Sequence, residues 1–409
     1  MLVSDFTYNL PEDRIAKFPP EVRGSTRLLV LNKNTGAIQD SRYKDLADFL
    51  NPGDVLILND TRVMQSRIFC TLPDGRKREL VVLEKHGDEP QRVMYRGKLH
   101  EGDVLTVDDN LTKTEGFRSA PVGGEAREPR GDGSERRGPR FGKIIIRHLL
   151  DGGIAEVESD TPLAELAERC GTVPLPPYLH RDATEADKKR YQTVWAKNMG
   201  SAAAPTASLN MTEDLLNKLK QKGVIVKYLT LHVGLGTFLP IRTDNIEDHK
   251  MHSEWYHIPE DTLDIIKSVR NVSFEGLPER GSARMSARAP WQTAPWDADD
   301  PKGRRARATR PEKEICEHPR IVALGTTVAR TLEYYAKTGK TEGEDDIFIY
   351  PGYEFKLVDA LITNFHAPKS TVLMLAAAFA GWDHLKNAYN HAIDEKYNFL
   401  SYGDSMLIC

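Results

Sequence analysis

The sequence is poor in cysteine. Its 409 residues include only four, Cys70, Cys170, Cys316 and Cys409, and these lie far apart along the chain. None of the spacings matches a zinc motif, and a disulfide framework needs more cysteines in a shorter chain. We therefore expect no disulfide and no metal site, and a reducing, cytoplasmic compartment.

Long apolar runs and a net positive charge are also missing. No window approaches the roughly 18 apolar residues of a membrane span, and residues 1–13 lack the basic-then-apolar order of a signal peptide. The formal net charge is -4, so a polyanion would have to bind a local patch rather than the whole surface. The apolar share of 40% and the charged share of 28% are typical of a water-soluble globular protein. The length favours two domains, and we expect a monomer.

The pattern of apolar residues predicts two kinds of domain. Between residues 63 and 160, short strand candidates alternate with glycine-containing turns and no long amphipathic helix intervenes, which is typical of a small all-β barrel or sandwich. Residues 1–62 and 161–409 alternate buried strands, polar turns and helices, which predicts a parallel or mixed sheet. The expected fold class is therefore an α/β sheet domain with an inserted small all-β barrel domain. The strands expected are 67–71, 79–85, 91–96, 104–107, 143–147 and 154–158 in the barrel, and 28–32, 55–58, 224–233, 320–324 and 360–363 in the sheet.

Two segments fit neither domain. Residues 113–140 are rich in Gly, Arg, Glu and Pro, and residues 279–311 contain no Val, Ile, Leu or Phe. Neither can bury enough apolar surface to offset the entropy of an ordered chain, so we expect both to be disordered insertions. The second carries seven arginines and one lysine against four acidic residues, and an auxiliary polyanion-binding arm is the alternative to a solvated loop.

Polar residues follow the buried strands of the α/β part. Asp60, Gly234, Gly325 and Asn364 each open such a string, and the carboxyl ends of parallel strands are where these sheets bind ligands. The glycines Gly234 and Gly236 let the backbone approach a ligand, although the third glycine of a dinucleotide fingerprint is missing. Gly325-Thr326-Thr327 at a helix start suits an anion or a carboxylate.

A short stretch before Trp255 concentrates His249, His252 and Glu254. Three roles compete for these side chains: metal ligation, acid–base chemistry and structural hydrogen bonding. The stretch has no helical stripe and no nearby cysteine, so a metal is disfavoured. Imidazoles titrate near neutrality, which favours acid–base chemistry.

Taken together and in this order, the strings resemble the S-adenosylmethionine:tRNA ribosyltransferase-isomerase family of the queuosine pathway. The resemblance covers essentially everything except the two insertions. It rests on the strings at 5–11, 59–63, 174–178, 190–194, 231–238, 248–255, 325–327 with Arg330, 364–371 and 402–404. It implies an α/β domain with a barrel inserted near its start, S-adenosylmethionine as a ribosyl donor, and a tRNA acceptor whose wobble base is 7-aminomethyl-7-deazaguanine. The product implied is epoxyqueuosine, with adenine and methionine released.

The implied chemistry suggests three groups of site residues. A base beside the sulfonium, an acceptor for the ammonium proton and a proton donor for adenine are needed; candidates of the right kind are His249, His252, Glu254, His232, His366 and Asp60. The pocket for S-adenosylmethionine is expected from Tyr191, Gln192, Thr193, Thr206, Gly234, Gly236, Thr237, Phe238, Gly325, Thr326, Thr327 and Asn364. Phosphates of the tRNA would bind basic side chains, for which Arg62, Arg67, Lys188, Lys189 and Arg190 are candidates.

One string departs from the family. Where the family commonly has Thr-Ala-Gly-Leu-His-Phe-Thr, this chain has Asn210 at the histidine position. Asparagine can donate a hydrogen bond but cannot act as a base. A catalytically altered RNA-binding paralogue is therefore the main alternative to the enzyme, and a conventional methyltransferase is a third class.

Overall fold

The computed structural model describes residues 1–83, 90–108, 140–150, 153–234, 241, 243–270 and 319–409. The two proposed insertions lie outside the described residues, apart from Arg140, at which a strand begins. Cys316 and the predicted site residues Gly236, Thr237 and Phe238 also lie outside them. No helix among the described residues has both the length and the apolar character needed to cross a membrane.

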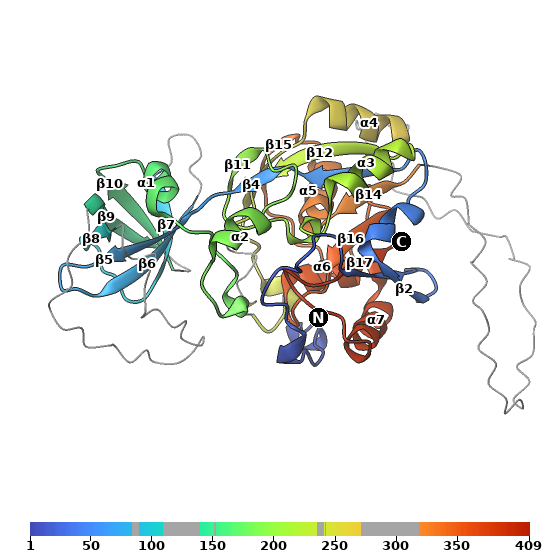
Figure 1. Ribbon diagram of the computed structural model, residues 1–409, viewed down its shortest axis with the longest axis horizontal. Helices are drawn as coiled ribbons and strands as arrows, with labels where there is room; N and C mark the ends of the chain where they lie inside the picture. The colour runs from blue at the N-terminus through green and yellow to red at the C-terminus, as the bar shows by residue number, and fades with distance from the viewer. Residues whose placement is uncertain (84–89, 109–139, 151–152, 235–240, 242, 271–318) are drawn as a thin grey trace, which may run out of the picture.

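A nine-stranded mixed sheet forms the core of the larger unit (Figure 1). Four neighbouring strands at its centre, β12, β3, β14 and β16, run parallel to one another. Their carboxyl ends therefore meet at one edge, as the polar strings at the strand ends predict. The strands in spatial order are β15 (Glu342–Asp345), β13 (Glu254–His257), β12 (Ile225–Leu231), β3 (Val55–Asn59), β14 (Ile321–Leu324), β16 (Ala360–Asn364), β17 (Ser405–Ile408), β1 (Arg27–Leu31) and β2 (Ile38–Arg42).

Helices cover both faces of this sheet. Residues of β1, β3 and β14 alternate between two apolar clusters, one shared with α4, α5, α6 and α7 and the other with α3 and the 3-10 helix Tyr43–Asp48. Local signals set the helix ends: Thr212 caps α3 by accepting from the Leu215 N–H, and Ser370 caps α6 by accepting from the Leu373 N–H. The helices are α1 (Leu163–Cys170), α2 (Glu185–Arg190), α3 (Glu213–Gln221), α4 (Glu260–Arg270), α5 (Thr326–Thr338), α6 (Thr371–Ala380) and α7 (Trp382–Asp394).

The second unit is a closed antiparallel barrel, at the left of Figure 1. Alternation along its strands puts side chains such as Ile68 and Cys70 inside and their neighbours outside. The strands in order around the barrel are β10 (Ile154–Ser159), β7 (Gln91–Arg96), β6 (Lys77–Val82), β5 (Arg67–Thr71), β8 (Val104–Asp108) and β9 (Arg140–Leu150). The expected fold class, an α/β sheet with an inserted barrel, is confirmed.

The apolar spacing of residues 43–50 predicts a helix, and the structure forms a 3-10 helix over Tyr43–Asp48 rather than an α-helix. The domain limits at residues 62 and 160 stay a prediction, and the packing favours grouping α1 with the barrel because Leu163 and Leu166 lie in the barrel's apolar cluster. A short parallel pair, β4 (Thr61–Val63) with β11 (Asn198–Ser201), follows β3 directly on the way to the barrel.

Candidate functional site

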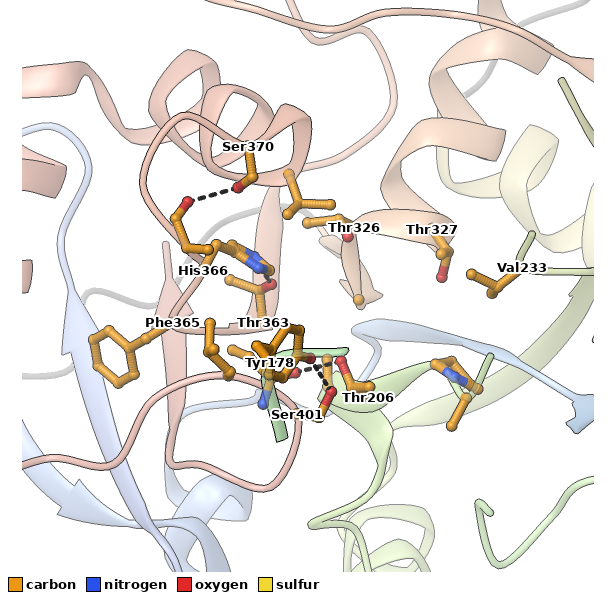
Figure 2. Close-up of a pocket in the computed structure, with 18 of the residues that line it drawn as sticks. Tyr178, Thr206, Val233, Thr326, Thr327, Thr363, Phe365, His366, Ser370 and Ser401 are labelled. Atoms are coloured by element: carbon orange, nitrogen blue, oxygen red, sulfur yellow. Dashed lines mark hydrogen bonds between the residues drawn. The ribbon is translucent and has the colours of Figure 1, made fainter. Parts of the chain in front are cut away.

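A cavity of about 360 Å³ opens at the carboxyl edge of the central strands (Figure 2). Its wall combines residues that follow β14 and β16 with loop residues from distant parts of the chain. The sequence-predicted residues that line it are Thr206, Gly325, Thr326, Thr327, Asn364 and His366. The strand-end reasoning therefore brings six of the predicted residues to one place, with Val233 of the 231–238 string beside them.

Asn364 supplies an unused hydrogen-bond donor to this cavity. Its side chain is only 2% exposed, and its Oδ1 accepts a hydrogen bond from Thr206 Oγ1 at 2.9 Å. Its Nδ2 has no hydrogen-bond partner among the described residues. A buried amide donor without a partner is costly. The Thr206 contact fixes the orientation of this amide in the cavity wall.

The start of α5 adds further unused polar groups. Gly325 has φ +103°, a left-handed value that suits glycine, and no side chain in the described part of the chain caps the helix. The first backbone N–H groups of a helix carry partial positive charge and lack partners within the helix. Thr327 Oγ1 is also buried, with no partner among the residues that the structure describes. This end of the cavity suits a carboxylate or another anion.

His366 lies in the cavity wall and is neutral near pH 7. Its Nε2 contacts Thr363 Oγ1 at 2.8 Å, and its backbone N–H donates to the Tyr389 hydroxyl. Although the open cavity leaves part of the ring accessible, desolvation lowers the pKa of His366 to about 3. In the free protein the ring is therefore a hydrogen-bonding group rather than a cation.

His232 and Asp60 lie in a separate network at the ends of β12 and β3. The Nδ1 of His232 is 2.8 Å from Thr61 Oγ1, and its ring stacks on Trp255 with 5.2 Å between centroids. Asp60 accepts hydrogen bonds from Thr230 Oγ1 at 2.7 Å and from the Asn198 amide. Neither side chain lines the cavity, so its walls include only one of the six predicted acid–base residues, His366.

Glu254 is buried in an ion-pair cluster. Its Oε2 lies 2.9 Å from Arg330 Nη2, and Arg330 also contacts Asp345 at 3.2 Å. Burial alone would lower the pKa of Arg330, but the two carboxylates outweigh it and raise the pKa, so the guanidinium stays charged. Glu254 Oε1 accepts the Gly234 N–H at 2.7 Å, which fixes the backbone three residues beyond the end of β12.

His249 and His252 lie on the chain between a 3-10 helix (Ile246–Asp248) and β13. His249 packs edge-on against Phe348, and burial together with the nearby His252 lowers its pKa. His252 is exposed. The described residues contain no group of three or more His, Cys, Asp or Glu side chains that could hold a metal ion.

The string Tyr191–Thr193 lies beside the cavity rather than in its lining. Gln192 uses both ends of its amide on the backbone of Val63, accepting from its N–H and donating to its carbonyl. Tyr191 is fully buried in an apolar cluster with Tyr402. These contacts stabilise the segment around Val63, which connects the sheet to the barrel.

The five basic candidates fall into two groups. Arg62, Lys188 and Lys189 are exposed, and Lys188 pairs with the exposed Glu185 at 2.9 Å. Arg67 pairs with Glu79 at 3.0 Å, and Arg190 donates to the carbonyls of Pro20 and Glu21. Because their guanidinium groups have protein partners, Arg67 and Arg190 are weaker candidates for phosphate contacts.

Asn210 lies outside the cavity lining and is 2% exposed. Its amide donates to the Gly403 carbonyl at 3.0 Å and to Ser405 Oγ at 3.1 Å. It therefore ties the loop after Pro205 to the start of β17. A donor at this position is sufficient for that contact, and no proton needs to be carried.

Several cavity residues were missed by the strand-end reasoning. Tyr178 and Ser401, which share a hydrogen bond, Thr363 and Lys369 all line it (Figure 2). Burial raises the pKa of Tyr178 to about 12, so its hydroxyl stays protonated. Tyr178 closes the string 174–178 and Lys369 lies in the string 364–371, so the family resemblance was a signal that could have found both.

Comparisons with known proteins converge on one family. The family described as queuosine biosynthesis protein matches residues 3–274 and 306–408, so the unmatched part, 275–305, overlaps the proposed second insertion. Proteins called S-adenosylmethionine:tRNA ribosyltransferase-isomerase from Pelodictyon phaeoclathratiforme and Chlorobium phaeobacteroides are both 44% identical to this chain, with 100% of each chain covered. A crystal structure of S-adenosylmethionine tRNA ribosyltransferase from Thermotoga maritima is 27% identical, with a TM-score of 0.47, and covers 99% of this chain and 100% of its own. The chain belongs to the S-adenosylmethionine:tRNA ribosyltransferase-isomerase family of queuosine biosynthesis proteins.

Proposed function

We propose that this protein transfers the ribosyl part of S-adenosylmethionine to 7-aminomethyl-7-deazaguanine at the wobble position of tRNA and isomerises it. The product is epoxyqueuosine in tRNA, and adenine and methionine leave. The observation that carries the proposal is the full-length match to relatives of that name, at 44% identity. The methyltransferase alternative is disfavoured because the glycine string 234–236 lacks the third glycine expected of a nucleotide-binding turn.

The cavity fits S-adenosylmethionine in its chemistry. The substrate carries a carboxylate, an amino group, a sulfonium and an adenine. The carboxylate suits the start of α5 with Thr326 and Thr327, and Lys369 is a cation in the same lining. The free Nδ2 of Asn364 needs an acceptor, which an adenine or ribose atom can supply. When bound, the sulfonium acidifies the neighbouring C5′ hydrogens.

The chain's own residues position groups and exclude water in this arrangement. Thr206 orients Asn364, and the contact between Tyr178 and Ser401 closes one side of the cavity. His366 is neutral and can accept or donate a hydrogen bond, with Thr363 fixing its ring. Glu254 holds the backbone N–H of Gly234, next to Val233 of the cavity lining. The acid–base roles of His232, His249, His252, Glu254, His366 and Asp60 stay predictions.

The presence of Asn210 in place of the family's histidine is compatible with the proposed activity. Its contacts to Gly403 and Ser405 are those of a positioning residue. A neutral histidine at the same place would also present a ring N–H donor to such acceptors. The replacement therefore keeps a donor at that position.

One assay separates the candidate functions. Purified protein is incubated with S-adenosylmethionine and tRNA that carries the precursor base. Adenine release with a gain of tRNA mass supports the proposal, whereas S-adenosylhomocysteine indicates a methyltransferase. Binding of tRNA without product indicates the non-catalytic paralogue and contradicts the proposal.

A matched pair of variants tests the pocket. Asn364→Asp keeps an acceptor for Thr206 but removes the free donor, and we expect the Kd for S-adenosylmethionine to rise about tenfold or more. Asn217→Asp makes the same change at an exposed position of α3 and should leave the Kd unchanged. Equal affinity in both variants, with unchanged melting temperatures, would remove Asn364 from the site.

A further inference from the structure

A second cavity, of about 230 Å³, lies on the other side of the chain segment that borders the first. Leu400 and Ser401 line the first cavity, whereas Lys396, Asn398 and Asp404 line the second. The remaining lining comes from the N-terminal part of the chain: Pro20, Ser25, Thr26, Arg27 and Arg42. The second cavity thus brings three cationic side chains together against one carboxylate.

The cations in this cavity are placed at a cost to the fold. Arg27 and Arg42 are directly opposite each other on the antiparallel strands β1 and β2. Like charges at directly opposed positions repel and destabilise a sheet. Lys396 has φ +59°, in the left-handed region that non-glycine residues seldom adopt.

Two of the three cations have no counter-ion among the residues that the structure describes. Arg27 is held by Asp40 at 3.4 Å and lies over the Tyr397 ring. Arg42 and Lys396 are exposed and make no ion pair within 4 Å in the described part of the chain. An anion entering the cavity would therefore meet two cations that make no direct ion pair, although Arg42 acts at longer range on Asp404 and Lys396 on Asp13.

The carboxylate of Asp404 is held by the backbone, and a hydroxyl in the wall is unused. Both oxygens of Asp404 accept backbone N–H groups, from Arg27 at 2.6 Å and from Asn398 at 2.7 Å. Desolvation raises the pKa of Asp404, although those hydrogen bonds oppose the rise. Thr26 is 8% exposed and its Oγ1 has no partner among the described residues, which leaves a buried donor in the wall.

We propose that this cavity binds a backbone phosphate of the tRNA and so fixes the register of the anticodon loop on the enzyme. The inference rests on the proposed function, because it assumes a tRNA substrate. A phosphodiester offers acceptors to Arg42, Lys396 and Thr26, and most contacts that position nucleic acids go to phosphates. Because the segment 396–404 borders both cavities, the phosphate is held beside the site where the base reacts. The overall charge of -4 makes such a local site necessary.

The test measures tRNA binding as a function of salt. We expect the double variant Arg42→Ala with Lys396→Ala to raise the Kd for precursor tRNA about tenfold at low salt. The slope of log K against log salt should fall by about 0.7 for each single-strand phosphate that the variant no longer neutralises. Lys218→Ala with Lys220→Ala, two exposed lysines of α3, is the matched control and should change neither quantity.

Stability and small-molecule binding separate a binding role from a structural one. Arg42→Ala alone relieves the repulsion with Arg27, so its melting temperature should equal or exceed that of the wild type while its tRNA affinity falls. The Kd for S-adenosylmethionine should stay unchanged in all variants. A loss of stability with unchanged tRNA affinity would overturn the proposal.

Two further outcomes distinguish this inference from the proposed function. If the wild type binds precursor tRNA but the double variant has the same Kd and salt slope, the phosphate site is wrong and the enzymatic proposal stands. If inorganic phosphate binds the wild type and not the double variant while tRNA binding is equal, the cavity is a small-anion site and the nucleic-acid inference is also wrong. If the wild type neither binds precursor tRNA nor releases adenine, the proposed function is wrong, and the phosphate site that rests on it is wrong as well.

Discussion

The buried pair between Glu254 and Arg330 offers a direct test of how the backbone at Gly234 is held. The side chains are 3% and 9% exposed and 2.9 Å apart. Glu254→Gln keeps an acceptor for the Gly234 N–H but removes the charge. Breaking a buried ion pair on one side costs about 3–5 kcal/mol. Because Arg330 keeps Asp345 at 3.2 Å, we expect the lower end, about 3 kcal/mol of unfolding free energy.

Urea unfolding at neutral pH measures this cost, and Glu342→Gln is the matched control. Glu342 pairs with His257 at 3.5 Å but is 70% exposed, so its loss should change the unfolding free energy by less than about 0.5 kcal/mol. Combining Glu254→Gln with Arg330→Met removes both charges, and the double variant should lose less stability than the sum of the two single variants. The coupling between Glu254 and Arg330 would be refuted if Glu254→Gln lowered the unfolding free energy by less than about 1 kcal/mol. It would also be refuted if the effects of the two single variants added up to that of the double variant.

The same variant separates a positioning role from an acid–base role for Glu254. A positioning residue acts through the Gly234 backbone beside the cavity residue Val233, so we expect a weaker affinity for S-adenosylmethionine and an unchanged shape of the pH–rate profile. Removing a general base lowers turnover by about 10²–10⁴ and abolishes one limb of the profile. That second result, with the fold intact, would make Glu254 a catalytic residue.

Four other perturbations have defined outcomes. Burial alone would raise the pKa of Asp187, but hydrogen bonds from Arg181, Thr184 and Tyr402 hold it well below the usual 3.8. The ionised carboxylate therefore stabilises the fold above about pH 4, and this stabilisation is lost in more acidic solution. Asp187→Asn should flatten the dependence of the melting temperature on pH in that acidic range. His366→Gln should keep the inflections of the adenine-release profile between about pH 5.5 and 8, because the ring that it replaces is already neutral there; a lost inflection would assign it to His366. His252→Ala should leave the melting temperature unchanged, since the side chain is exposed, and should lower adenine release strongly; wild-type turnover would remove His252 from the chemistry. Replacing residues 279–311 by a short Gly/Ser bridge should leave the melting temperature and the S-adenosylmethionine affinity nearly unchanged, because the segment contains no Val, Ile, Leu or Phe and a change of loop length has a small entropic cost. A large drop in melting temperature would contradict this.

The barrel and the edge of the sheet that holds the cavity were predictable, because both are indicated by patterns among neighbouring residues of the sequence. Two of the barrel strands, Arg67–Thr71 and Gln91–Arg96, begin and end where alternation and turns predict. Asn364 ends the buried strand β16, and Thr327 lies in the first turn of the helix that follows β14, so the rule for parallel sheets was enough to group them.

The parts that could not be predicted depend on contacts between distant segments. Ser405–Ile408 is too short to show a period, and only its pairing with β16 and β1 makes it an interior strand of the sheet. Ser401 reaches the cavity through a loop, which leaves no local signal. Gln192 was expected in the cavity, but its amide is used on the Val63 backbone, and nothing in its neighbouring residues indicates that partner.

The pairing of β1 with β17 has a consequence for synthesis of the protein. Leu28 pairs with Ser405, so nearly the whole chain separates two neighbouring strands of one sheet. The barrel strands, by contrast, all lie between Arg67 and Ser159. During translation the barrel can close while the ribosome is still adding the second half of the α/β unit, whereas β1 and β16 keep open edges until β17 emerges. Nascent chains stalled before Ser405 should therefore carry a protease-resistant barrel and a protease-sensitive sheet.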